Sequence, residues 1–253
     1  MKKEIIILWL SSFIIVFLAV YISNIIDEDY PITSTFGIDG KKVSYRFEKI
    51  HYGTEDFKVI IRTDVPELTG TLYWKSKIDS EWRFRELKQS ELILSADIPV
   101  LKPTQKIDYY IELNHRDKTF ILPENQKVCL TFFGKIPIVV NFLEFLLLYF
   151  GLVAAVRTGL EFFNNSLKAK AFGFVTLIIF LTLIALINPL YLTYKYGYMN
   201  SSIPPIGNLF LVSDLVIFIL WIITVVAVFK SNRFKAAPLF SAVITLIIFI
   251  LFR

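Results

Sequence analysis

Five runs of apolar residues divide this chain, and a long stretch of mixed polar and apolar residues separates the first run from the other four. The first run covers residues 5–22, in which Ser11, Ser12 and Tyr21 are the polar members. The others cover residues 136–156, 172–192, 209–229 and 238–252. Because a membrane-spanning helix needs about 20 apolar residues, the runs predict an α-helical bundle of five transmembrane helices, the last of them short.

The first run also has the features of a signal sequence, which is either kept as a membrane anchor or cleaved. The apolar core of a cleaved signal peptide is usually about 7 to 15 residues long and ends in a small-x-small site. Here the run is longer, and it closes with Val20, Tyr21, Ile22 and Ser23. These features favour an uncleaved N-terminal signal-anchor helix within residues 1–23. Residues 136–253 are predicted to form a four-helix transmembrane domain.

Residues 24–135, between the first two predicted spans, show a different pattern, in which apolar and polar positions alternate with a period of two. Such alternation is typical of strands that bury one face. It occurs in short stretches at residues 43–47, 57–61, 72–74, 82–84, 92–98, 107–113, 120–122 and 130–132. Seven or eight short strands separated by turn-forming residues predict one inserted all-β domain, an antiparallel sandwich.

Part of this region resembles an immunoglobulin-like or fibronectin type III domain. The resemblance runs from Gly70 through Trp74 and Trp82 to residues 98–99 and 107–111. It implies that Trp74 is the buried aromatic residue of the third strand, and that Tyr109 or Tyr110 lies in the tyrosine-corner region. Antibody domains have a pair of cysteines between their sheets, whereas this chain has one cysteine. The similarity is therefore to the immunoglobulin-like sandwich architecture and not to antibody domains in particular.

Composition and charge also indicate a membrane protein. Of its 253 residues, 55% are hydrophobic and 19% are charged, whereas about a quarter of the residues in a soluble protein are charged. Residues 24–136 carry 17 Lys and Arg against 18 Asp and Glu, a net charge of −1, and the remaining residues carry 10 against 4. Nucleic-acid binding would need a basic stripe in the soluble part, so no nucleic-acid partner is expected.

Few residues are candidates for metal or cofactor chemistry. The single cysteine, Cys129, excludes an internal disulfide and any multi-cysteine metal site. The two histidines, His51 and His115, show no ligand spacing and are expected in loops or on the surface. No phosphate-binding glycine loop occurs in the sequence. The sequence therefore predicts no cofactor, no metal site and no catalytic residue.

The short loops predict the orientation in the membrane, because cytoplasmic loops carry an excess of Lys and Arg. The loop over residues 193–208 has one cation, Lys195. With the N-terminus in the cytoplasm, eight cations near the spans would be cytoplasmic: Lys2, Lys3, Arg157, Lys168, Lys170, Lys230, Arg233 and Lys235. Residues 24–135 and the C-terminus would then be extracytoplasmic, and the spans would lie in the plasma (inner) membrane, in contact with membrane lipid.

Five polar residues form a candidate intramembrane polar site: Asn141, Glu144, Asn188, Ser213 and Asp214. An ionisable side chain within the membrane is costly unless it is paired, hydrated or protonated, and so it is a functional candidate. In the functional interpretation, Glu144 and Asp214 are ligands for a proton or a cation. The alternative is a structural role for each residue, as a helix cap, a kink or a helix–helix hydrogen bond.

Three segments resemble a family of uncharacterised bacterial membrane proteins that have an immunoglobulin-like outward sandwich followed by four helices. The segments are residues 134–137, 156–161 and 196–214, and the resemblance covers roughly the C-terminal half. It implies the topology and supplies no catalytic residue. It also indicates that Arg157 is a candidate cytoplasmic contact to a partner or a lipid phosphate. The alternative is that Arg157 only helps to orient the chain in the membrane.

Three functions agree with these features. The first is a non-catalytic membrane subunit or scaffold whose outward sandwich binds an extracytoplasmic partner, and the binding-type domain favours it. The second is a small transporter or membrane enzyme that uses Glu144 and Asp214. The third is a membrane insertase or chaperone, although the predicted spans contain no internal Arg or Lys and the loop over residues 157–171 is short for that class.

Overall fold

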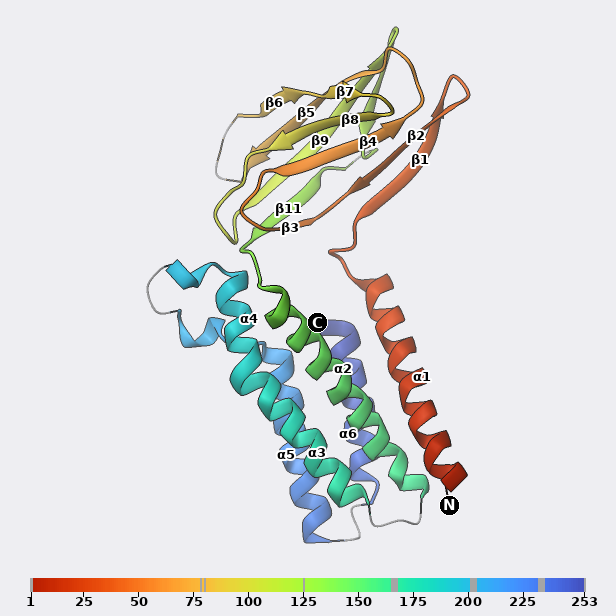
Figure 1. Cartoon of the computed structure of the whole chain (residues 1–253), viewed down its shortest axis with the longest axis vertical. Helices are drawn as coiled ribbons and strands as arrows, with labels where there is room; N and C mark the ends of the chain where they lie inside the picture. The colour runs from red at the N-terminus through yellow and green to blue at the C-terminus, as the bar shows by residue number, and fades with distance from the viewer. Residues whose placement is uncertain are drawn as a thin grey trace. The chain divides into compact units, whose positions relative to one another are not determined.

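The structure is a computed structural model that describes residues 2–77, 79, 81–124, 126–164, 168–200, 204–231 and 235–252. Arg233 and the end of the chain at residue 253 lie outside the described residues. The chain divides into two compact units (Figure 1). The β-unit consists of Glu28–Lys135 and Lys195–Gly197. The helical unit consists of Met1–Asp27, Ile136–Tyr194 and Tyr198–Arg253.

The β-unit contains two sheets. The five-stranded sheet has the order β1-β2-β4-β8-β7, all antiparallel. Its strands are β1 (Ile32–Ile38), β2 (Lys41–Phe47), β4 (Phe57–Thr63), β8 (Ile93–Ile98) and β7 (Lys88–Ser90). The six-stranded sheet has the order β3-β11-β9-β5-β6, and β10 pairs with β9. Its strands are β3 (Ile50–Tyr52), β11 (Val128–Phe133), β9 (Lys106–His115), β5 (Thr69–Ser76), β6 (Arg83–Glu86) and β10 (Lys118–Leu122).

The predicted alternation is confirmed in most strands of the β-unit. In β4 and β9 every second residue is buried, because successive side chains of a strand point to opposite faces. Side chains from both sheets meet in one apolar core, so the sheets form a sandwich. The prediction is wrong for the stretch 82–84, since Trp82 is only half-buried and Phe84 is 69% exposed. The corresponding strand β6 is the last in its sheet, and all four of its residues are exposed.

Tyr109 differs from the expected tyrosine corner. Its side chain is fully buried in the core of the β-unit, and its hydroxyl donates a hydrogen bond to the carbonyl of Glu48 at 3.0 Å. A tyrosine corner bonds to the backbone only a few residues upstream, whereas Glu48 lies 61 residues earlier. The bond therefore ties β9 to the segment after β2. Trp74, as the resemblance implies, is buried.

The helical unit has helices α1 (Lys2–Ile26), α2 (Ile138–Leu160), α3 (Ala169–Thr182), α4 (Asn188–Lys195), α5 (Val212–Lys230) and α6 (Ala237–Phe252). Four helical stretches are long and apolar enough to cross a membrane: Lys3–Ile26, Ile138–Phe163, Ala169–Lys195 and Val212–Lys230. The fifth apolar helix, α6, has 16 residues. The third stretch joins α3 to α4 through a π-helical segment, Leu183–Ile187. Pro189 follows that segment and lacks the N–H that a regular α-helix needs, which explains the irregular turn.

Small residues and hydroxyl groups bring the helices of this unit close together. A Cβ added to Gly151 would lie 2.9 Å from the ring of Phe180, and one added to Gly159 would lie 2.8 Å from the Cβ of Ala242. Side-chain hydrogen bonds also join neighbouring helices, among them Thr158 with Thr176 at 3.1 Å, Thr224 with Ser241 at 2.5 Å, and Trp221 Nε1 with Thr245 Oγ1 at 3.0 Å. Such contacts are typical of helices that pack within a membrane.

Candidate functional site

Two of the five predicted intramembrane residues meet in the structure. Asn188 begins α4 and Asp214 lies in the first turn of α5, and both are buried. The Asn188 amide donates a hydrogen bond to Oδ2 of Asp214 at 2.6 Å. Among the described residues, the Asn188 Oδ1 is buried and makes no hydrogen bond. This pair is a polar site enclosed by apolar helices.

The other three predicted residues are less enclosed. Asn141 is exposed and Glu144 is half-buried, both on α2, and Ser213 is half-buried on α5 next to Asp214. Glu144 makes interactions of its own in the structure. The proposed role of Glu144 as a proton or cation ligand stays a prediction.

Arg157 does not lie where the sequence analysis expected it. Its side chain is fully buried, and its Nη2 lies 2.6 Å from Oε1 of Glu161, one helical turn later. The guanidinium carbon lies 4.7 Å from the ring centre of Phe172 and 5.6 Å from that of Trp9. A buried guanidinium cannot reach a partner or a lipid phosphate at the surface, so the candidate cytoplasmic contact is corrected to an internal ion pair. The i, i+4 spacing of Arg157 and Glu161 was a signal that could have predicted the pair.

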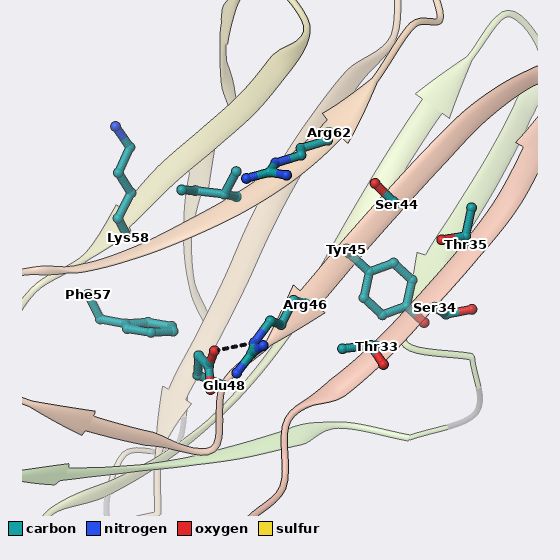
Figure 2. A pocket seen from close by; sticks show the side chains of 11 residues that line it. Thr33, Ser34, Thr35, Ser44, Tyr45, Arg46, Glu48, Phe57, Lys58 and Arg62 are labelled. Atoms are coloured by element: carbon teal, nitrogen blue, oxygen red, sulfur yellow. Dashed lines mark hydrogen bonds and ion pairs between the residues drawn. The ribbon is translucent and has the colours of Figure 1, made fainter.

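The outer face of the five-stranded sheet carries a shallow cavity of about 730 Å³ (Figure 2). Two strands supply its cations, Arg46 from β2 and Lys58 and Arg62 from β4. Hydroxyl groups of Thr33, Thr35 and Ser44 lie beside them. Glu48 forms an ion pair with Arg46 at 2.7 Å. We name the surface of Arg46, Lys58, Arg62 and these three hydroxyl residues the cationic face. Sequence reasoning missed it, although the alternation in β2 and β4 puts these residues on one side.

A second, larger cavity of about 960 Å³ lies beside strands β1 and β10. Ser34 and Phe36 of β1 line one side of it, and residues 119–122 of β10 line another. The rings of Phe36 and Phe120 approach to 6.0 Å between centres. Trp82, Tyr110, Glu112 and Lys127 also line this cavity. We name it the edge groove, because two sheet edges border it. β1 is the edge strand of its sheet, and β10 is attached to the other sheet through β9 alone.

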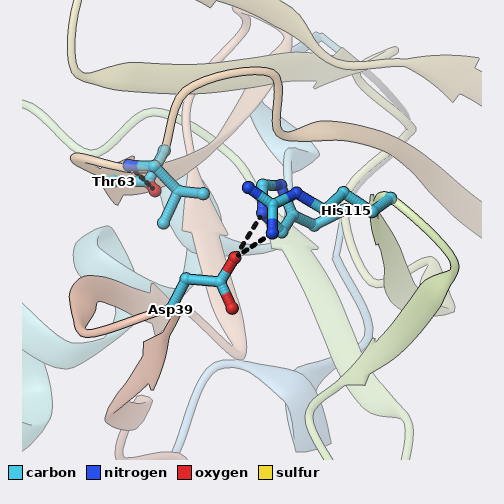
Figure 3. Close-up of polar contacts among 5 residues, drawn as sticks. Asp39, Thr63 and His115 are labelled. Atoms are coloured by element: carbon cyan, nitrogen blue, oxygen red, sulfur yellow. Dashed lines mark hydrogen bonds and ion pairs between the residues drawn. The ribbon is translucent and has the colours of Figure 1, made fainter.

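A third polar cluster joins two hairpin turns (Figure 3). Oδ2 of Asp39 accepts a hydrogen bond from Nε2 of His115 at 3.1 Å and lies 3.0 Å from Nη1 of Arg116. The hydrogen bond from His115 lowers the pKa of the Asp39 carboxyl, and the Arg116 charge acts in the same direction. His115 is buried, which corrects the expectation of a surface histidine. His51, by contrast, is half-buried, and its Nε2 contacts the carbonyl of Glu55 at 2.8 Å.

No protein-family model matches the chain, and no curated protein matches it.

Proposed function

We propose that this chain is a non-catalytic membrane subunit whose sandwich binds an extended segment of an extracytoplasmic partner protein. The observation that carries the proposal is the edge strand β1. Strands at the edge of a sheet usually carry charges, are short, or are covered, because their free backbone groups pair with other chains. β1 is seven residues long with the sequence ITSTFGI, and none of these residues is charged. Such an edge is suited to accept a partner strand.

The register identifies which backbone groups of β1 are available. Ile38 and Lys41 flank the two-residue turn of Asp39 and Gly40, both of which have positive φ. In such a hairpin the flanking residues form a hydrogen-bonded pair, and the pattern then alternates along the strand. The N–H and C=O groups of Thr33, Thr35 and Gly37 therefore point away from β2, toward the free edge.

The edge groove beside β1 is suited to take the side chains of an added strand. In strand addition, backbone hydrogen bonds supply affinity and neighbouring pockets supply specificity. Trp82 and Tyr110 line the groove, and Trp and Tyr are enriched among the residues that dominate protein interfaces. Ile121 on β10 is 51% exposed and lines the same groove. These features favour a polypeptide as the occupant of the groove.

The proposal places the sandwich in the immunoglobulin-like class. Strands β2, β4, β8 and β7 would correspond to strands A, B, E and D of that class, and β11, β9 and β5 to G, F and C. In this proposal the helical unit spans the plasma (inner) membrane five times, with α6 as the last span. The cations near residues 2–3, 157–170 and 230–235 support a cytoplasmic N-terminus and an extracytoplasmic β-unit.

The experiment compares two proline substitutions at opposite edges of one sheet. Thr35→Pro removes an N–H that faces the free edge of β1, which a sheet edge tolerates. Gln89→Pro is the matched control on β7, where Ser90 and Ile93 flank a two-residue turn, so the N–H of Gln89 also faces a free edge. Each tagged protein is purified from its native membranes in mild detergent. Companion proteins are then quantified by mass spectrometry.

We expect a companion protein at a fixed ratio with the natural chain and with Gln89→Pro. Thr35→Pro should reduce the amount of this companion at least tenfold, because one hydrogen bond and the strand geometry are lost. Unfolding temperatures of the three proteins should agree within a few degrees. A protein purified alone in every case, or a companion retained by Thr35→Pro, would contradict the proposal.

The buried pair of Asn188 and Asp214 favours a second candidate function, a small transporter that moves a proton or a cation. A carboxyl group enclosed by apolar helices is a common element of proton pathways. Protein in liposomes with an internal pH dye would show proton entry driven by a potassium diffusion potential. Asp214→Asn should abolish that entry, and Thr182→Ala, which removes a hydroxyl bonded within its own helix, should leave it. The absence of proton entry with the natural chain would exclude proton transport.

A further inference from the structure

We infer that the cationic face binds an anionic polysaccharide. This site differs from the edge groove, and its ligand differs in chemistry from the partner strand of the proposed function. The cationic face lies on the outer side of the five-stranded sheet, where the hydroxyl residues lie on one side of Arg46 and Lys58 lies on the other (Figure 2).

Acidic neighbours compensate only part of the positive charge of this face. Residues 24–136 carry 17 cationic and 18 acidic side chains, so the region as a whole is nearly neutral. Arg46 is paired with Glu48, and Lys58 lies opposite Asp97 in the register of β4 and β8. Arg62 lies opposite Ser44 on one side and Ile93 on the other. Among the residues that the structure describes, no ion pair is formed by Arg62 or Lys58. Both cations are exposed and can receive an anionic ligand.

The spacing of the cations favours a polymer over a single small anion. Lys58 and Arg62 lie four residues apart on β4, which corresponds to about 13 Å along a strand. Side chains of a strand stand roughly perpendicular to the sheet, which keeps the two charges apart, so a chain with repeated anionic groups matches them better than one phosphate or carboxylate does. Arg62 offers a planar guanidinium, which binds carboxylate or phosphate with two parallel hydrogen bonds.

The hydroxyl groups favour a sugar polymer over an acidic polypeptide. Thr33 and Thr35 from β1 and Ser44 from β2 line one side of the cavity, where Thr33 lies opposite Arg46 and Ser44 lies opposite Arg62. Each hydroxyl can both donate and accept a hydrogen bond. Sugar hydroxyls have the same capacity, so the hydroxyl groups along a polysaccharide chain match this lining. The cavity volume of about 730 Å³ falls within the range of ligand-binding clefts.

The test measures binding of polygalacturonate, a carboxylate-bearing polysaccharide, to the full chain in detergent. The variant Lys58→Gln with Arg62→Gln removes two charges from the cationic face. The matched control, Lys77→Gln with Lys106→Gln, removes two charges from exposed positions elsewhere in the β-unit. We expect the first variant to weaken binding at least tenfold, and the control to change it less than twofold. Binding should also weaken as the salt concentration rises, because exposed charges are screened.

Three further probes decide the ligand class. Neutral dextran should not bind, while polyglutamate and glycerol phosphate, the soluble headgroup of phosphatidylglycerol, should bind at least tenfold more weakly than polygalacturonate. Equal or tighter binding of polyglutamate would identify an acidic polypeptide as the ligand and overturn the inference. Binding to glycerol phosphate alone would identify lipid headgroups and overturn it as well.

An equal loss in the control variant, or no binding of polygalacturonate, would also overturn the inference. The outcome is separate from that of the strand-addition experiment, because Lys58→Gln with Arg62→Gln changes side chains of β4 and leaves the backbone of β1 intact. Thr35→Pro also removes a hydroxyl group of the cationic face, so that variant is not used to measure polysaccharide binding.

Discussion

Two arginine–glutamate pairs, one in each unit, have nearly equal contact distances and opposite surroundings. Arg157 and Glu161 lie 2.6 Å apart and are fully buried in the helical unit. Arg46 and Glu48 lie 2.7 Å apart on the surface of the β-unit, with side chains 64% and 39% exposed. Water stabilises each exposed charge on its own, whereas each buried charge depends on its partner. The contribution of each ion pair to stability is therefore expected to depend on its burial more than on its contact distance.

The largest effect is expected from breaking the buried pair. Glu161→Gln leaves the Arg157 charge buried without a counter-charge, and a guanidinium cannot lose its proton in a protein. We expect a loss of about 3–5 kcal/mol in the free energy of unfolding. The measurement is thermal unfolding in detergent.

A double variant provides the control for this prediction. Arg157→Met with Glu161→Met removes both charges, and it should recover most of the stability, because well-packed apolar residues often replace a buried pair without loss. A Glu161→Gln protein as stable as the natural chain would show that the buried pair contributes little.

An intermediate effect on stability is expected from removing the charge of Asp39. Its partner His115 is buried, while Asp39 itself is half-exposed. The pKa of Asp39 is below its ordinary value of 3.8 in the folded protein. The stability that this carboxylate contributes is therefore fully present above the ordinary pKa, and it is lost as the pH falls through the lower folded pKa.

Asp39→Asn should remove this part of the pH dependence, since asparagine also tolerates the positive φ at this turn. Thermal unfolding of the β-unit, followed by the infrared band of β-sheet between about pH 5 and 2, provides the measurement. Identical curves for the two proteins would contradict the assignment.

The smallest effect is expected from the exposed pair. Glu48→Gln should change the free energy of unfolding by less than about 1 kcal/mol, because solvent screens both charges. The same thermal assay as for Glu161→Gln gives a direct comparison. A loss as large as that of Glu161→Gln would show that exposure does not separate the two pairs.

Local sequence patterns predicted most of the secondary structure. The period-two alternation located the strands that bury one face, such as β4 and β9. The strands β1, β3 and β7 were missed, because they are edge strands and few of their side chains are fully buried. Phe84 was predicted to be buried because its side chain is hydrophobic. It is exposed, because β6 lies at the edge of its sheet.

The candidate sites were less predictable than the elements. The sequence identified Asn188 and Asp214 as polar residues within apolar runs, but their contact joins residues 26 positions apart. Arg157 was assigned to the surface because a cation at the end of an apolar run usually faces water. The cationic face depends on the pairing of β1, β2 and β4, which brings together side chains that are far apart along the chain.

The sequence by itself determined the apolar helices and the alternating strands, because helix length and strand period are local properties of the chain. Only the tertiary structure decided which strands lie at the edges, which cations gather on one face, and which arginine is buried. These features depend on contacts between distant residues. Such contacts decide whether a charge is buried, and burial strongly changes the energy of that charge. The edge groove and the cationic face, which carry the two proposals, both arise from such contacts.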